Sequence, residues 1–182
     1  MKTHTVIFNP KLLKTGILVL LSLRLLSAHA QSVPLPNAFA HNDYCHKHPL
    51  FDALENGYTN IEADIFLEDD ELIVAHVNPF FRETKTLERL YFKPLFDRIT
   101  KNGGQVYKGY NDPVTLMIDI KTGASNTYRT LKPLLEKYRS ILSSYDHGKV
   151  CQGAITVVLS GHKPFKMINR NRTALLLLTK IC

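Results

Sequence analysis

Cysteine is scarce in this sequence, and its spacing rules out some kinds of site. The 182 residues contain three cysteines, Cys45, Cys151 and Cys182, with no C-x-x-C pair and no zinc-type cluster. A structural zinc site or a dithiol redox motif is therefore not expected. Three is an odd number, so one disulfide with one remaining thiol stays open, because spacing does not determine connectivity. We favour unpaired cysteines without a catalytic role.

The sequence also lacks internal repeats, low-complexity tracts and any basic stripe interleaved with aromatic residues. The missing stripe argues against nucleic-acid binding, although the formal net charge is +7. Much of this charge lies near the amino terminus. The first thirty residues hold four of the 23 lysines and arginines and none of the 16 acids, which leaves a net charge of +3 on the remainder. A mildly basic surface suits an anionic substrate.

The amino terminus has the features of a secretory signal peptide. Three lysines precede an apolar run at 16–26, and the Ala-His-Ala at 28–30 offers a small-x-small cleavage site. The run is shorter than the roughly 20 residues of a membrane-spanning helix, although an uncleaved signal anchor is the alternative. We expect residues 1–30 to be removed, the protein to be secreted or periplasmic, and no transmembrane span to remain.

Strand and helix patterns alternate through the rest of the chain. Residues 31–37 show no periodicity and are expected to be a tether that leads into one domain at 38–182. Strands are expected at 38–41, 60–67, 114–120 and 154–159, a fifth in 173–178, and a short returning strand at 71–76. Helices are expected at 49–57, 84–100 with a break at Pro94, and 125–144. This alternation predicts an α/β fold with a parallel sheet.

Three acidic residues fall on two of these strands. Glu62 and Asp64 alternate with apolar neighbours and therefore share a face. Asp119 lies near the end of the strand 114–120, whose almost wholly apolar sequence predicts burial on both faces. Three carboxylates that face one point repel unless a cation lies between them, and oxygen ligands favour Mg²⁺ or Ca²⁺. We therefore expect one divalent cation there.

Further polar residues lie at or near the carboxyl ends of these and other expected strands, where α/β folds place ligand sites. Lys121 is suited to orient a substrate phosphate or to hold a carboxylate, and His41 and His76 are suited to act as an acid/base pair. Asn42 is either a substrate or metal-shell contact or a turn former. An E-x-D on a strand is more often a solvated face, so an unrelated α/β binding domain stays open.

The order of these motifs resembles the phospholipase C-like phosphodiesterase superfamily of TIM barrels. The matching segments are AHND at 40–43, IEADIFLEDDELIVAH at 61–76 and LMIDIKT at 116–122. The HNDY at 41–44 and the VVLSGHKP at 157–164 look most like the branch related to Aim6, a fungal mitochondrial-inheritance protein.

The resemblance implies a metal-dependent phosphoric diester hydrolase that acts on a phosphodiester small molecule or a phospholipid head group. It implies Glu62, Asp64 and Asp119 as the metal ligands, His41 and His76 as the acid/base pair, and Lys121 as a phosphate contact. It also implies a (β/α)₈ barrel.

Two departures from the superfamily pattern qualify these expectations. Asn42 and Asp43 replace the arginine and glycine that usually follow the first histidine, so the glycerophosphodiester substrate class is not implied. The second departure is length, because a complete barrel takes about 200 residues or more and this sequence has 182. We therefore expect the amino-terminal part of a barrel, with four to five parallel strands. The alternative function is a truncated, catalytically incompetent relative that only binds metal or a phosphorylated ligand.

Overall fold

The computed structural model describes residues 32–79, 85–146, 149–168, 173–174 and 177–178. The signal peptide predicted at 1–30 and Cys182 lie outside these ranges. Cys45 and Cys151 are exposed free thiols. Within the described ranges, no helix is both long enough and apolar enough to cross a bilayer.

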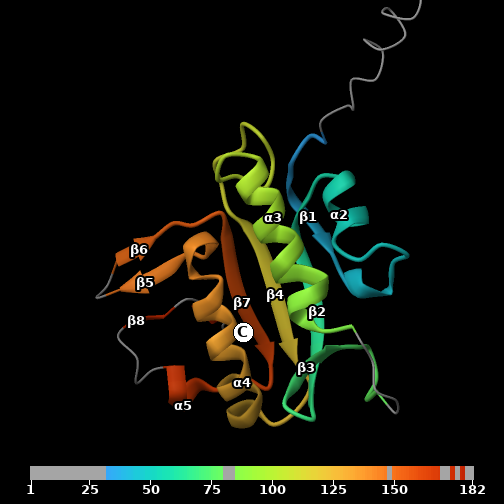
Figure 1. Ribbon diagram of the computed structural model, residues 1–182, viewed down its shortest axis with the longest axis vertical. Helices are drawn as coiled ribbons and strands as arrows, with labels where there is room; N and C mark the ends of the chain where they lie inside the picture. Colours follow the sequence, from blue (N-terminus) through green and yellow to red (C-terminus); the bar gives the residue numbers. More distant parts are fainter. Residues whose placement is uncertain (1–31, 80–84, 147–148, 169–172, 175–176, 179–182) are drawn as a thin grey trace, which may run out of the picture. The chain divides into compact units, whose positions relative to one another are not determined.

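A sheet of six strands organises the described part of the chain (Figure 1). Five strands are parallel in the order β1-β2-β4-β7-β9, and β3 pairs antiparallel with β2. Their bounds are β1 (Leu35–Ala40), β2 (Tyr58–Glu68), β3 (Glu71–Val74), β4 (Val114–Ile120), β7 (Ile155–Gly161) and β9 (Leu177–Leu178). The predicted α/β class and strand number are confirmed. Within the described residues the sheet is open, as in part of a TIM barrel.

Four α-helices in the described ranges lie between these strands. They are α2 (Phe51–Glu55), α3 (Lys93–Lys101), α4 (Ala124–Lys137) and α5 (Phe165–Ile168). A π-helix (Glu88–Phe92) runs directly into α3, and Pro94 lies in the first turn of α3. Because proline has no N–H to donate, it fits a first turn better than a helix interior. The predicted break at Pro94 is nevertheless not observed, because the helical backbone runs on through Phe92 and Lys93 and changes from π- to α-helix just before Pro94.

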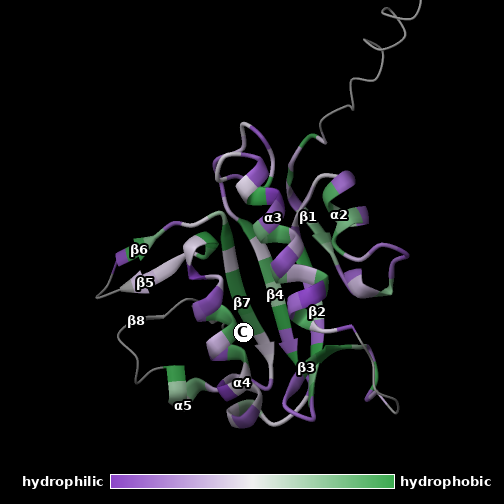
Figure 2. Cartoon of the chain, in the orientation of Figure 1, coloured by the Kyte–Doolittle hydropathy of each residue, from purple (hydrophilic) through white to green (hydrophobic). Residues whose placement is uncertain are grey.

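One face of the sheet carries the hydrophobic core. In β4, Val114, Leu116, Ile118 and Ile120 are buried in one apolar cluster with residues of α3 and α4, whereas Thr115, Met117 and Asp119 are half-buried. Figure 2 shows β4 as mostly hydrophobic, with a hydrophilic carboxyl end. The prediction that this strand is buried on both faces is therefore wrong, because among the described residues the helices cover only one of its faces. The other face is left for polar groups.

Two other sequence predictions need correction. Strand β1 begins at Leu35, inside the predicted tether, because the Leu35 N–H donates to the Gly57 carbonyl at 2.8 Å and its own carbonyl accepts from Thr59. Helix α4 ends at Lys137 rather than near 144. Ile141 and Leu142 continue the apolar pattern and are buried, but Leu142 is extended and bridges to Ile155.

A small second sheet follows α4. It has the order β6-β5-β8 and comprises β5 (Ser144–Asp146), β6 (Lys149–Cys151) and β8 (Thr173–Ala174). The sequence did not predict it, because its strands are too short to show a period of two residues. The segment predicted as the fifth strand, 173–178, is divided between the two sheets, since β8 joins this one and β9 pairs with β7.

The burial of β7 provides a stability test. Val157 is fully buried, whereas Val150 in β6 is 61% exposed. We expect Val157→Ala to lower the free energy of unfolding by about 2 kcal/mol, since it removes two buried methyl groups and leaves a cavity. The matched Val150→Ala change is expected to alter it by less than about 0.5 kcal/mol. Urea denaturation measures both, and equal effects would contradict the assigned core.

Candidate active site

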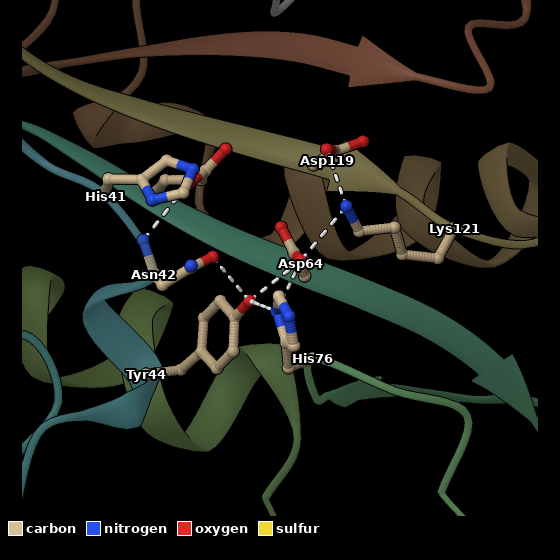
Figure 3. A network of polar contacts seen from close by, with 8 residues as sticks. His41, Asn42, Tyr44, Asp64, His76, Asp119 and Lys121 are labelled. Atoms are coloured by element: carbon tan, nitrogen blue, oxygen red, sulfur yellow. Dashed lines mark hydrogen bonds and ion pairs between the residues drawn. The ribbon is translucent and has the colours of Figure 1, made fainter.

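Three carboxylates meet on the polar face of the sheet (Figure 3). Glu62 and Asp64 lie two residues apart on β2, so their side chains share a face, and Asp64 is in register with Asp119 on the neighbouring β4. One ligand oxygen from each residue lies within 4.8 Å of the others. Glu62 and Asp64 are buried and Asp119 is half-buried. The predicted cluster of acids is therefore formed by adjacent strands.

Lys121 lies between two of these acids. Its Nζ is 2.8 Å from Asp119 Oδ2 and 3.0 Å from Asp64 Oδ2. Burial alone lowers the pKa of the ammonium, but its hydrogen bonds to Asp119 and Asp64 outweigh burial and raise that pKa. Lys121 therefore remains charged and offsets one of the three negative charges, which leaves a formal excess of two.

The second oxygen of each aspartate has no such partner. Asp64 Oδ1 and Asp119 Oδ1 are buried and make no hydrogen bond. The same is true of the hydroxyl of Ser160, which is in register with Asp119. Buried carboxylate oxygens are normally paired with a donor or a metal ion. Glu62, Asp64 and Asp119 could hold a cation whose preferred ligands are oxygens, such as Mg²⁺ or Ca²⁺.

His41 directly follows β1 and reaches Glu62. Its Nε2 lies 3.2 Å from Glu62 Oε2, and the Asn42 N–H donates to the same oxygen at 3.0 Å. Asn42 adopts a left-handed conformation (φ 51°, ψ 40°), which asparagine tolerates better than most residues. It therefore turns the chain, and its backbone N–H also orients Glu62.

His76 follows β3 and is linked to Asp64 by the hydroxyl of Tyr44, which contacts both side chains. The Tyr44 hydroxyl is 2.7 Å from Asp64 Oδ2, 3.0 Å from His76 Nδ1 and 2.8 Å from Asn42 Oδ1. The Tyr44 and His76 rings stack at 6.4 Å. Burial, followed by the hydrogen bond to Asp64, raises the pKa of Tyr44. The hydroxyl therefore keeps its proton.

A buried aspartate fixes the loop that carries Asn42 and Tyr44. Asp43 is fully buried, and its Oδ2 accepts from the Leu50 N–H at 2.6 Å and from the Tyr91 hydroxyl at 2.8 Å. Leu50 has a positive φ of 67°, a conformation that is costly for a bulky residue. The Asp43 hydrogen bonds stabilise this turn and so hold the loop against the sheet.

The end of β7 closes the site beside Asp119. Gly161 has φ +64°, and a Cβ at this position would overlap Asp119 Oδ1 and the Ile120 carbonyl. His162 follows it, but its Nδ1 contacts the Thr122 carbonyl at 2.9 Å and the residue is exposed. His46 and His48 are also exposed and lie near Asp43 and Asp52. These three histidines are thus engaged outside the carboxylate cluster.

Comparison with known proteins places the chain in a family. Residues 27–177 match the model of the AIM6-like phosphodiesterase domain. The chain belongs to this family. The AIM6-like chain is 30% identical over 168 residues to altered inheritance of mitochondria protein 6 of Kluyveromyces lactis, with 72% of the chain and 39% of that protein covered.

Further relatives carry the same name. That of Eremothecium gossypii is 33% identical over 149 residues, with 71% of the chain and 38% of the relative covered. That of Saccharomyces cerevisiae is 32% identical over 155 residues, with 72% of the chain and 38% of the relative covered. The AIM6-like chain therefore spans about two-fifths of the length of these curated relatives. No solved structure matches it.

The structure brings together all seven residues that the sequence nominated in the AIM6-like domain (His41, Asn42, Glu62, Asp64, His76, Asp119 and Lys121). It adds Tyr44 and Gly161, which sequence reasoning missed. The available signal for Tyr44 was its place in the HNDY motif, three residues after His41. Gly161 lies in the VVLSGHKP segment at 157–164, but that segment does not show that Asp119, on another strand, leaves no room for a side chain there.

Gly161 provides a test of how tightly β7 encloses Asp119. We expect Gly161→Ala to lower the free energy of unfolding by about 3 kcal/mol or more, because it combines a positive φ with a steric overlap. Gly109 has φ +79° and no atom within 4 Å of an added Cβ. The matched Gly109→Ala change should therefore cost only the backbone term of about 1–2 kcal/mol. Equal losses in urea denaturation would show that Asp119 is not confined by Gly161.

Proposed function

We propose that this AIM6-like domain carries the metal-binding and acid/base residues of a phosphoric diester hydrolase. The observation that supports it best is the pair of buried, unpartnered oxygens, Asp64 Oδ1 and Asp119 Oδ1, beside Glu62. His41 and His76 flank this cluster in Figure 3. The family's description as a phosphodiesterase domain agrees with this chemistry.

The charge of the cluster suits one divalent cation. Glu62, Asp64 and Asp119 carry three formal negative charges and Lys121 offsets one, so a divalent ion neutralises the remainder. The donor set contains only oxygens, which favours Mg²⁺ or Ca²⁺ over zinc or copper. When bound, the ion supplies a Lewis acid that stabilises negative charge on a phosphoryl group.

The protein's own residues supply the other parts of the reaction. One histidine accepts a proton from the attacking hydroxyl, and the other donates a proton to the leaving alcohol as the P–O bond breaks. Lys121 orients the phosphate and offsets charge that develops on its oxygens. The substrate class is a phosphodiester small molecule or a phospholipid head group, whose phosphate Lys121 would contact.

Metal binding is tested by thermal stability. We expect the melting temperature to rise with Mg²⁺ or Ca²⁺ concentration, because an ion that binds the folded state at 100 times its Kd stabilises by about 2.7 kcal/mol. Asp119→Asn should abolish this shift. Glu136→Gln, on an exposed side chain that contacts Arg139, should retain it. A wild-type melting temperature that neither Mg²⁺ nor Ca²⁺ raises would contradict the metal site.

Hydrolysis is tested with bis-p-nitrophenyl phosphate. We expect turnover that EDTA abolishes and that His41→Ala and His76→Ala each reduce by about a hundredfold or more, as loss of a general acid or base does. His48→Ala is the matched control, since His48 is exposed and contacts Asp52. Metal binding without turnover in the folded wild type would instead favour a domain that only binds metal or a phosphorylated ligand.

A further inference from the structure

Tyr44 is the one residue in the described site whose side chain touches both a carboxylate of the cluster and a histidine of the acid/base pair. We propose that Tyr44 is a positioning residue that holds neutral His76 in the tautomer with its proton on Nδ1. This leaves Nε2 as the nitrogen that exchanges a proton with the substrate. The inference rests on the proposed function for the use of Nε2, but the tautomer itself does not depend on activity.

The argument begins with the single proton of the hydroxyl. It has three neighbours within hydrogen-bond distance, but a phenol donates only once. The Asp64 carboxylate, which is ion-paired with Lys121, can only accept. At 2.7 Å, the shortest of the three distances, two oxygens without a shared proton would repel. The Tyr44 proton therefore lies on the hydrogen bond to Asp64.

His76 must then donate to the hydroxyl. The Tyr44 oxygen has lone pairs left once its proton is committed, and His76 Nδ1 lies 3.0 Å from it. A bare Nδ1 lone pair facing that oxygen would be unfavourable. Asp64 Oδ2 is 3.7 Å from the same nitrogen and also favours a proton there. Both neighbours thus select Nδ1–H in the neutral imidazole.

Asn42 is compatible with this assignment. Its side-chain amide has both a carbonyl oxygen and an NH₂ group, and either can face the hydroxyl. When the Tyr44 hydroxyl donates to Asp64, the assignment requires the flipped Asn42 amide, with its NH₂ group in place of Oδ1 at 2.8 Å from the Tyr44 oxygen. The oxygen then accepts from Asn42 and His76 and donates to Asp64, so all its hydrogen-bonding capacity is used.

The network also leaves the proposed metal site free. Tyr44 and Lys121 both bind Asp64 through Oδ2, whereas Oδ1 of the same carboxylate is buried and unpartnered. A cation at Oδ1 therefore does not compete with Tyr44. Tyr44 is 8% exposed and its ring stacks on His76, so the hydroxyl has little freedom to turn away.

The two histidines thus contact the cluster through opposite nitrogens. His41 faces Glu62 through Nε2, whereas His76 faces Tyr44 and Asp64 through Nδ1. The nitrogen left for the substrate is accordingly Nδ1 in His41 and Nε2 in His76. Nε2 is farther from the backbone than Nδ1, so His76 presents the more extended proton-exchanging atom.

The tautomer can be read directly from nitrogen NMR. Proton–nitrogen correlation spectra of ¹⁵N-histidine-labelled full chain in Mg²⁺, at about two units above the ordinary imidazole pKa of about 6.5, distinguish protonated from bare ring nitrogens. His76→Gln identifies the His76 signals among those of the eight histidines. We expect His76 to show a protonated Nδ1 and a bare Nε2. A protonated Nε2 in the wild type would overturn the proposal without any variant.

Tyr44→Phe tests the role of the hydroxyl. We expect His76 to lose its single tautomer and to show averaged nitrogen shifts, with kcat for bis-p-nitrophenyl phosphate lowered about tenfold and KM little changed. Tyr138→Phe is the matched control, since it removes another hydroxyl that donates to a carboxylate, Glu88, without touching His76 or the loop that carries Tyr44.

The outcomes separate this inference from the proposed function. A His76 spectrum unchanged by Tyr44→Phe would overturn the positioning role, whatever the activity. The Nδ1–H tautomer in a folded chain that hydrolyses nothing would sustain the positioning role while contradicting the hydrolase.

Discussion

The crowding of three carboxylates, only two of which are paired with the ammonium of Lys121, is the constraint on which the rest of the structure depends. Two like charges about 4 Å apart repel by about 4 kcal/mol at an effective dielectric constant of about 20. Asp64 is 1% exposed, so water screens it little. The register of β2 and β4 nevertheless sets Asp64 beside Asp119, and Lys121 bridges them. The packing of the hydrophobic face of the sheet must outweigh this repulsion for the strands to stay in register.

The loop after β1 reinforces that arrangement. Asn42 turns in a left-handed conformation and donates to Glu62, while Tyr44 donates to Asp64. Between them, Asp43 is fully buried and bonds to Leu50 and Tyr91. Backbone strain at Asn42 and Leu50 is therefore offset by hydrogen bonds that also orient the acids. Fold stability and site geometry depend on the same contacts.

The sequence was sufficient to predict the parts of the fold that repeat locally. The alternation around Glu62 and Asp64 gave their shared face, and the apolar runs gave the parallel strands. It was not sufficient where tertiary contacts override the pattern. Ile141 and Leu142 continue the α-helical pattern, but Ile141 ends a short 3₁₀-helix and Leu142 is extended, because Leu142 bridges to β7. Tyr44 and Gly161 matter through partners 20 and 42 residues away in sequence, Asp64 and Asp119, and no local spacing encodes such contacts.

The central claim is that Glu62, Asp64 and Asp119 bind one divalent cation in this AIM6-like domain. Anomalous diffraction from a crystal soaked in Mn²⁺ tests it most directly, because Mn²⁺ substitutes for Mg²⁺ and scatters X-rays anomalously. We predict a single strong anomalous peak between these three carboxylates, with Tyr44 and Lys121 still bound to Asp64 Oδ2. A site without a peak, or a peak only at the exposed His46 and His48, would contradict the account.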